Sequence, residues 1–186
     1  QADRVSGAQK RYGSPKVVCL NGEWDFKFYP HPAKLPEVLD TDDVEFDKLD
    51  VPSCWQFRGY AKPFYVNMRY QFPYQPPEIP TTEAAGKSFC WIGSDHGIGP
   101  RWQEPVEEYN YVGVYRRFFE MGDAGKNHVL SFLGVASCID LYVNGSFVGY
   151  SEGAHNMAEF DISSYIHAGT NELVAVVRRW CNGTYL

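Results

Sequence analysis

The sequence lacks the features that mark several whole classes of protein. Its 17 Lys and Arg are outnumbered by 23 Asp and Glu, and no stretch concentrates the basic residues, which argues against a nucleic-acid partner. No apolar run approaches the roughly 20 residues that a membrane span requires. The chain opens without Met and without a hydrophobic leader, which we interpret as removal of an upstream segment. A periplasmic or secreted bacterial protein fits that interpretation, and a cytoplasmic one is also allowed.

The cysteines provide neither a zinc motif nor a redox motif. They are odd in number, widely spaced and free of any Cys-x-x-Cys pair: Cys19, Cys54, Cys90, Cys138 and Cys181. We therefore predict free thiols, several of them buried as small apolar groups. Asp95 and His96 follow Cys90, but no second His stands at ligand spacing, so we predict no metal site.

The sequence also lacks a long amphipathic helix, and strand patterns take its place. Trp24, Phe26 and Phe28 alternate with polar residues, which is typical of a strand with one buried face. Asn144 and Gly145 separate two strand-like runs and predict a tight hairpin. We expect strands at 17–20, 23–29, 63–72, 111–119, 128–133, 138–143, 147–151, 157–161 and 171–177. Two packed antiparallel sheets are the predicted architecture.

The intervening segments are expected to form loops and turns. Residues 30–50 carry three prolines and an acidic run, which predicts a surface excursion. Residues 161–169 predict a short helical turn, with Asp161 or Ser163 as its N-cap and Gly169 beyond its end. Residues 78–110 form a long loop containing Trp91 and Trp102. These two rings are candidates for sugar stacking, and anchoring the loop is the favoured alternative.

Ordered motifs along the chain resemble one enzyme family. Leu-Asn-Gly-Glu-Trp-Asp-Phe stands at 20–26, Val-Pro-Ser-Cys-Trp-Gln at 51–56, Gly-Val-Tyr-Arg-Arg at 113–117 and Val-Asn-Gly-Ser-Phe-Val-Gly-Tyr-Ser at 143–151. Further matching pieces lie at 59–60, 63–67, 70–73, 76–77, 158–161, 169–173 and 179–180. Together they resemble the N-terminal sugar-binding domain of glycoside hydrolase family 2, in its large β-galactosidase branch.

The resemblance implies an all-β, jelly-roll β-sandwich of the galactose-binding-domain type. It implies an arm over residues 1–16 and a domain over 17–186, followed in the parent enzyme by an immunoglobulin-like domain and a (β/α)8 barrel. The two catalytic glutamates of a retaining mechanism belong to that barrel, so we expect no catalytic residue here and no activity of this chain alone. A homo-oligomer that acts on β-galactosides or related glycans is implied. This stretch needs no cofactor, whereas the parent enzyme is expected to use Mg or Na ions.

Two positions match segments that reach the sugar pocket in the family. Gln75 stands where well-known members have Asn. Asn182 stands where the family has an Asp that contacts the sugar and a monovalent cation. An amide can still bond a hydroxyl through its oxygen and its nitrogen, but it brings no negative charge, which weakens the expectation of a cation. The alternative for Asn182 and Gly183 is a simple turn.

The long loop near residues 86–108 departs from the family, whose counterpart is much shorter. It could alter the preferred substrate length, or pack against a neighbouring domain or subunit. Two other functions remain open at this stage. The chain could be an independent carbohydrate-binding module, or an assembly domain of a β-glucuronidase-like or β-mannosidase-like enzyme.

Overall fold

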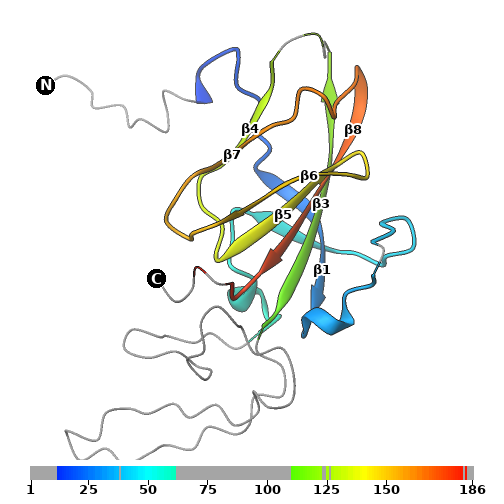
Figure 1. Cartoon of the computed structure of the whole chain (residues 1–186), viewed down its shortest axis with the longest axis vertical. Helices are drawn as coiled ribbons and strands as arrows, with labels where there is room; N and C mark the ends of the chain where they lie inside the picture. The colour runs from blue at the N-terminus through cyan, green and yellow to red at the C-terminus, as the bar shows by residue number, and fades with distance from the viewer. Residues whose placement is uncertain are drawn as a thin grey trace, which may run out of the picture.

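A computed structural model describes residues 12–37, 39–61, 110–122, 125, 127–181 and 183 of the chain. Its elements are eight strands and two short 3-10 helices (Figure 1). The strands are β1 (Gly22–Tyr29), β2 (Asp47–Val51), β3 (Val112–Met121), β4 (Val129–Phe132), β5 (Cys138–Val143), β6 (Ser146–Glu152), β7 (Ala158–Asp161) and β8 (Gly169–Arg178), and the helices are η1 (Pro32–Lys34) and η2 (Trp55–Arg58). Within these ranges no helix has the length and apolar character to cross a membrane.

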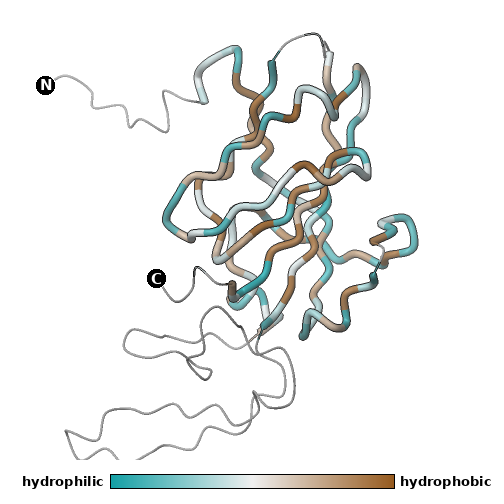
Figure 2. Tube along the Cα trace, viewed as in Figure 1, coloured by the Kyte–Doolittle hydropathy of each residue, from teal (hydrophilic) through white to brown (hydrophobic). Residues whose placement is uncertain are grey.

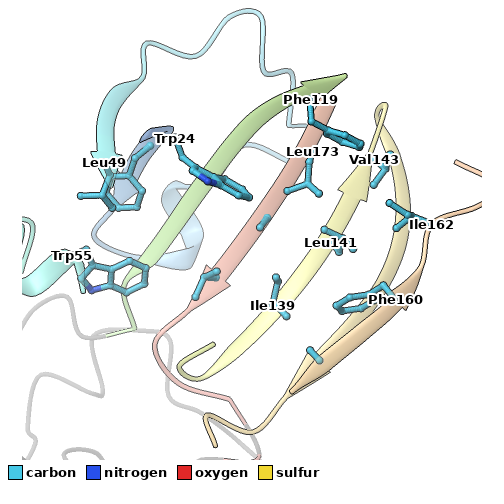
Figure 3. Close-up of a cluster of buried hydrophobic side chains, with 14 of the residues drawn as sticks. Trp24, Leu49, Trp55, Phe119, Ile139, Leu141, Val143, Phe160, Ile162 and Leu173 are labelled. Carbon is cyan, nitrogen blue, oxygen red and sulfur yellow. The ribbon is translucent and has the colours of Figure 1, made fainter. Parts of the chain in front are cut away.

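The strands form two antiparallel layers, which confirms the predicted all-β sandwich. Six strands make one sheet in the order β2-β1-β3-β8-β5-β6, and β4 pairs with β7 in a second, smaller sheet. Every pairing is antiparallel. The main core lies between the layers, where Phe160 and Ile162 face Ile139 and Leu141 (Figure 3).

The predicted alternation in β1 produces one buried face. Trp24 and Phe26 are 4% and 0% exposed, and Phe28 packs against the same cluster. Figure 2 shows hydrophobic and hydrophilic stretches interspersed along the strands. A fully buried ring of this size contributes about 1.5–3 kcal/mol through its removal from water.

The Asn144–Gly145 hairpin is confirmed by backbone geometry. β5 ends at Val143 and β6 begins at Ser146, and the two turn residues have φ values of 49° and 75°. Positive φ at both central positions fits the tight turn that matches strand twist. The hairpin pairs β5 with β6, with Val143 opposite Ser146 next to the turn, and the other edge of β5 pairs with β8.

The prediction of a strand at residues 17–20 is wrong. Val17 and Val18 are exposed, and strand structure begins only at Gly22. The reason lies in the pairing of β1, whose two edges are occupied by β2 and β3. A preceding strand would find no free edge of β1 to pair with.

The acidic residues of the 30–50 segment are exposed as predicted, yet the segment is more than a surface excursion. It ends in β2 and also covers the outer face of the large sheet. There, Leu35, Leu39 and Phe46 of the segment pack against four buried valines of β3 and β8, together with Tyr29 of β1 and Tyr142 of β5: Val112, Val114, Val174 and Val176. The outer face thus carries a second apolar cluster.

The 161–169 turn forms without a helix. Asp161 Oδ1 accepts hydrogen bonds from the Ser163 backbone N–H at 2.9 Å and the Ser163 hydroxyl at 2.5 Å. These bonds, the hydroxyl first, lower the pKa of the Asp161 carboxyl. Gly169 follows with φ of 96° and begins β8. Asp161 therefore bonds to the turn that follows it, but the helical turn that Asp161 or Ser163 was predicted to cap does not form.

Candidate functional site

The two predicted sugar-contact residues lie outside the described residues. Gln75 and Asn182 both fall there, and so do Trp91, Trp102 and the 86–108 loop. Their roles therefore stay predictions. The structure does describe Cys181 and Gly183 on either side of Asn182, and residues 61 and 110 at the two ends of the stretch that contains Gln75. These described residues define the candidate site.

The flanking segments meet at one end of the sandwich, which we call the Arg178 end. β3 begins where β8 finishes, because Val112 pairs with Arg178. η2 lies at the same end (Figure 1), where Trp55 packs so closely over Gly113 that a Cβ there would come within 2.4 Å of the ring. The Arg178 end therefore comprises η2, the start of β3 and the end of β8.

Backbone hydrogen bonds fix the chain as it leaves β8. The Ser137 N–H donates to Arg178 O at 2.9 Å, and its hydroxyl donates to Arg179 O at 2.6 Å. The Arg179 N–H donates to Tyr111 O at 3.0 Å. The Trp180 N–H donates to Asn110 Oδ1, also at 3.0 Å. Three consecutive residues are thus bound to two other segments of the chain.

Side chains strengthen the same junction. The Arg179 guanidinium lies over the Trp180 ring, 4.7 Å from its centroid, a distance typical of a cation–π contact. With its oxygen turned toward the neighbouring donors, the Gln56 amide accepts from Trp55 Nε1 at 2.9 Å and Arg179 Nη1 at 2.5 Å. Burial lowers the pKa of Arg179, and the electrostatic effect of Tyr111 acts in the opposite direction. Gln56 therefore joins η2 to the segment that follows β8.

Beyond Trp180 the described residues rest against β5 and β6. Cys181 is buried, and the thiol of Cys138, also buried, donates to Arg178 O at 4.0 Å. The neighbouring Cys181 thiol first, and burial second, raise the pKa of the Cys138 thiol, which therefore stays protonated at neutral pH. At Gly183 an added Cβ would lie 3.2 Å from the Glu152 carboxyl carbon. The four described cysteines are free, as predicted.

A groove of about 740 Å³ lies on the outer face between residues 35–42 and strands β5 and β8, and Arg178 also lines it. Four polar side chains that line the groove, those of Arg178, Asp140, Thr41 and Glu172, form hydrogen bonds with each other in two pairs. The Arg178 guanidinium contacts Asp140 Oδ2 at 2.5 Å, and the Thr41 hydroxyl donates to Glu172 at 2.7 Å. Because a ligand would compete with these bonds, the groove is the weaker candidate.

The sequence pattern indicated Gln56 only as part of a family motif, and gave no sign of Asn110 or Ser137. Asn110 precedes a strand and has no charge or periodicity to mark it. Its burial, at 3% exposed, is the sign of its role, since a buried amide requires hydrogen-bond partners.

The chain is similar to a known protein family along most of its length. A family model described as glycosyl hydrolases family 2, sugar binding domain, matches residues 17–94 and 100–186. A β-galactosidase from Actinobacillus pleuropneumoniae is 36% identical over 187 residues, which cover 100% of this chain and 16% of that protein. A β-galactosidase from Yersinia pestis bv. Antiqua (strain Angola) is 34% identical over 183 residues, or 98% of this chain and 15% of that protein.

A solved β-glucuronidase from Bifidobacterium dentium has a similar fold. It superposes with a TM-score of 0.52 at 21% sequence identity, covering 86% of this chain and 19% of that chain. At this identity the likeness supports the fold alone. The chain thus spans only 15–16% of the length of the curated relatives described above.

Proposed function

This chain belongs to glycosyl hydrolase family 2, and from that premise we propose that it is the N-terminal sugar-binding domain of a β-galactosidase-like retaining exo-glycosidase. One observation carries the proposal: the whole chain aligns with a protein named β-galactosidase while covering 16% of that protein. In this role the chain contributes a wall of the galactoside pocket, and the remainder of the enzyme supplies the catalytic glutamates.

The ion-paired carboxylate of Asp25 supports a structural role for this side chain. Retaining hydrolysis needs one carboxylate as nucleophile and a second, protonated carboxyl as acid. Asp25 bonds to Lys48 Nζ at 2.6 Å and to Arg116 Nη2 at 2.8 Å. Burial raises the pKa of Asp25, but the hydrogen bonds from Lys48 and Arg116 outweigh it, and the pKa lies below its usual value. Such a group stays ionised and engaged, which suits a structural ion pair.

The rigid Arg178 end supports the proposed pocket wall. Long antiparallel pairing between β3 and β8 leads directly into the hydrogen-bonded residues 178–180. Sites built on strands hold geometry better than sites on free loops. Amides at positions 75 and 182 would each offer a donor and an acceptor to sugar hydroxyls.

The proposal includes a homo-oligomeric parent with immunoglobulin-like and barrel domains. It also includes Mg or Na ions in that parent. In the part of the chain that the structure describes, no group of three His, Cys, Asp or Glu comes together to hold a metal. These residues do not fit an ion site, so we assign no step to a metal here.

An assay with a chromogenic β-galactoside tests the proposed function. The full-length protein is expected to hydrolyse it with retention of the β-anomer, followed by NMR, and the 186-residue chain is expected to give no turnover. Turnover by the chain alone that responds to substitutions within residues 1–186 would refute the domain role. A full-length protein with higher kcat/KM on β-glucuronides or β-mannosides would replace the proposed substrate class.

The matched family description, a sugar binding domain, also favours a second candidate: an independent carbohydrate-binding module. Calorimetric titration of the 186-residue chain with galactose and β-linked oligosaccharides separates the two. Saturable binding supports the module, and absence of heat at millimolar sugar excludes it.

A further inference from the structure

Cys138 and Cys181 stand far apart in the sequence, and the fold brings them to one place. Cys138 is the first residue of β5, and it pairs with Arg178 of β8 on one side and with Glu152 of β6 on the other. After β8 the chain approaches this same Glu152, because a Cβ added at Gly183 would lie 3.2 Å from its carboxyl carbon. Cys181 lies between Arg178 and Gly183 in sequence, so the chain carries it past Cys138.

Both thiols are buried at this place, and they are buried outside the apolar clusters. Cys138 and Cys181 are 2% and 7% exposed, yet neither is a member of the two clusters that the described residues form. Cys138 shares the outer face of β5 with Tyr142, because side chains two residues apart on a strand point the same way. The chain that follows β8 therefore shields the Cys138 thiol from water.

Electrostatic effects also place the two sulfurs together. The Cys181 thiol raises the pKa of the Cys138 thiol more than burial does. The pKa of the Tyr150 hydroxyl is raised first by burial, then by the hydrogen bond that it donates to Glu152, and further by Cys138 and Cys181. Because such effects act over about 4–6 Å, the two thiols and the hydroxyl form one cluster.

We propose that Cys138 and Cys181 form a disulfide when the protein meets an oxidant of the small-molecule disulfide class, so that the chain after β8 becomes linked covalently to the start of β5. In this structure both residues are thiols. The spacing of the cysteines gave no sign of the pair, since only the fold brings these two together. The inference is independent of the glycoside that the parent enzyme cleaves, because it concerns these two thiols alone.

The reaction consists of two thiol–disulfide exchanges. The Cys181 thiol, the less buried of the two, loses its proton and attacks one sulfur of the small disulfide, whose S–S bond breaks to release one small thiol. The Cys138 thiol then loses its proton and attacks the Cys181 sulfur of the mixed disulfide, which releases the second small thiol. The two protons pass to the departing thiolates, so two protein thiols are oxidised and one small disulfide is reduced. Because the thiolate is the attacking form, both steps are faster at alkaline pH.

The experiment treats the full-length protein with oxidised glutathione at about pH 8.5, near the ordinary pKa of a thiol. Remaining thiols are alkylated in denaturant, and the peptides of an unreduced digest are identified by mass spectrometry. Cys19 and Cys54 are internal controls, because both are exposed. Cys138→Ser and Cys181→Ser each remove one partner, and Cys19→Ser is the matched variant that leaves the pair intact.

We expect a peptide pair joined through Cys138 and Cys181. It should exceed the glutathione adduct of either cysteine by about tenfold, because a neighbouring thiol captures the mixed disulfide at high effective concentration. Cys19 and Cys54 should carry glutathione instead. Cys138→Ser and Cys181→Ser should abolish the linked pair, and Cys19→Ser should leave its yield unchanged. Hydrogen exchange of the peptide that contains residues 178–181 should slow on oxidation and recover on reduction, since the link limits local opening.

A Cys181 that ends as a glutathione adduct while Cys138 remains a thiol would show that the two sulfurs do not meet, and would overturn the inference. Two unmodified thiols in a protein whose Cys19 and Cys54 have reacted completely would overturn it as well. Linkage of Cys138 or Cys181 to a different cysteine also contradicts the proposed pair. If the Ser variants do not fold, the linkage found in the wild-type protein still decides the question.

Discussion

Replacement of Asn171 by Leu tests how much of the fold depends on one buried amide. Asn171 Oδ1 accepts from the His167 N–H at 2.9 Å and from Asn144 Nδ2 at 2.8 Å. Its Nδ2 donates to His167 O at 2.7 Å and to Gly169 O at 3.0 Å. The amide thereby joins the β5–β6 hairpin turn to the turn that precedes β8.

The expected loss follows from these four bonds. Each intramolecular hydrogen bond contributes a net of about 0.5–1.5 kcal/mol, so four together contribute about 2–6 kcal/mol. The additional apolar surface that Leu buries offsets about 1 kcal/mol of this loss of stability. The backbone groups of His167 and Gly169 are left short of a partner inside the protein. We therefore expect Asn171→Leu to lower the free energy of unfolding by about 3 kcal/mol.

Urea unfolding of the 186-residue chain, followed by tryptophan fluorescence, measures this change. Asn171→Asp is nearly the same size but cannot donate while ionised, so at neutral pH it should lose a comparable amount. Thr170→Val is the control, because the Thr170 hydroxyl bonds to Glu120 on the exposed surface and should be worth less than about 0.5 kcal/mol. A loss below about 1 kcal/mol in both Asn171 variants would refute the reasoning.

Two further substitutions probe the core and the ion pairs. Gly113→Ala places a Cβ 2.4 Å from the Trp55 ring, and we expect it to lower the free energy of unfolding by about 1–3 kcal/mol. Gly122→Ala is the control and should have little effect, because a Cβ there has nothing within 4 Å. Equal unfolding midpoints for the two variants would contradict the close packing at Gly113. Asp25→Asn removes a carboxyl whose folded pKa is lowered, so the wild type should be the more stable protein above about pH 4, the unfolded value. That advantage should vanish as the pH falls through the folded pKa, and a stability difference that is constant from pH 3 to pH 7 would speak against the ion pair.

The strands themselves were largely predictable from local pattern. The alternation of Trp24 and Phe26 gave β1 its buried face, and Asn144–Gly145 supplied two residue types that adopt successive positive φ values easily. The bond from Asp161 to the turn that follows it was predictable because its short side chain reaches the N–H of Ser163. These features depend on neighbours in sequence alone.

Features that depend on distant partners were missed. The run 17–20 has the composition of a strand, but β2 and β3 occupy both edges of β1, so the run has no edge of β1 to pair with. β2 has only Leu49 buried, so its sequence carried little apolar signal. Leu35 and Leu39 were assigned to a solvated loop because nothing local shows that four valines lie beneath them.

The candidate site divides in the same way. Gln75 and Asn182 were proposed from the family pattern and lie outside the described residues. The hydrogen-bond partners of Asn110 and Gln56 emerged only from the structure, since Trp180 and Arg179 stand 70 and 123 positions further along the chain.

The sequence by itself determined the fold class and the family, because turn chemistry, two-residue periodicity and ordered motifs are all written in short stretches of chain. Only the tertiary structure decided which edges are paired, which face the 30–50 segment covers and which amides bind the chain after β8. Those outcomes require residues remote in sequence to meet, and burial then strengthens their hydrogen bonds because water cannot compete for the same groups.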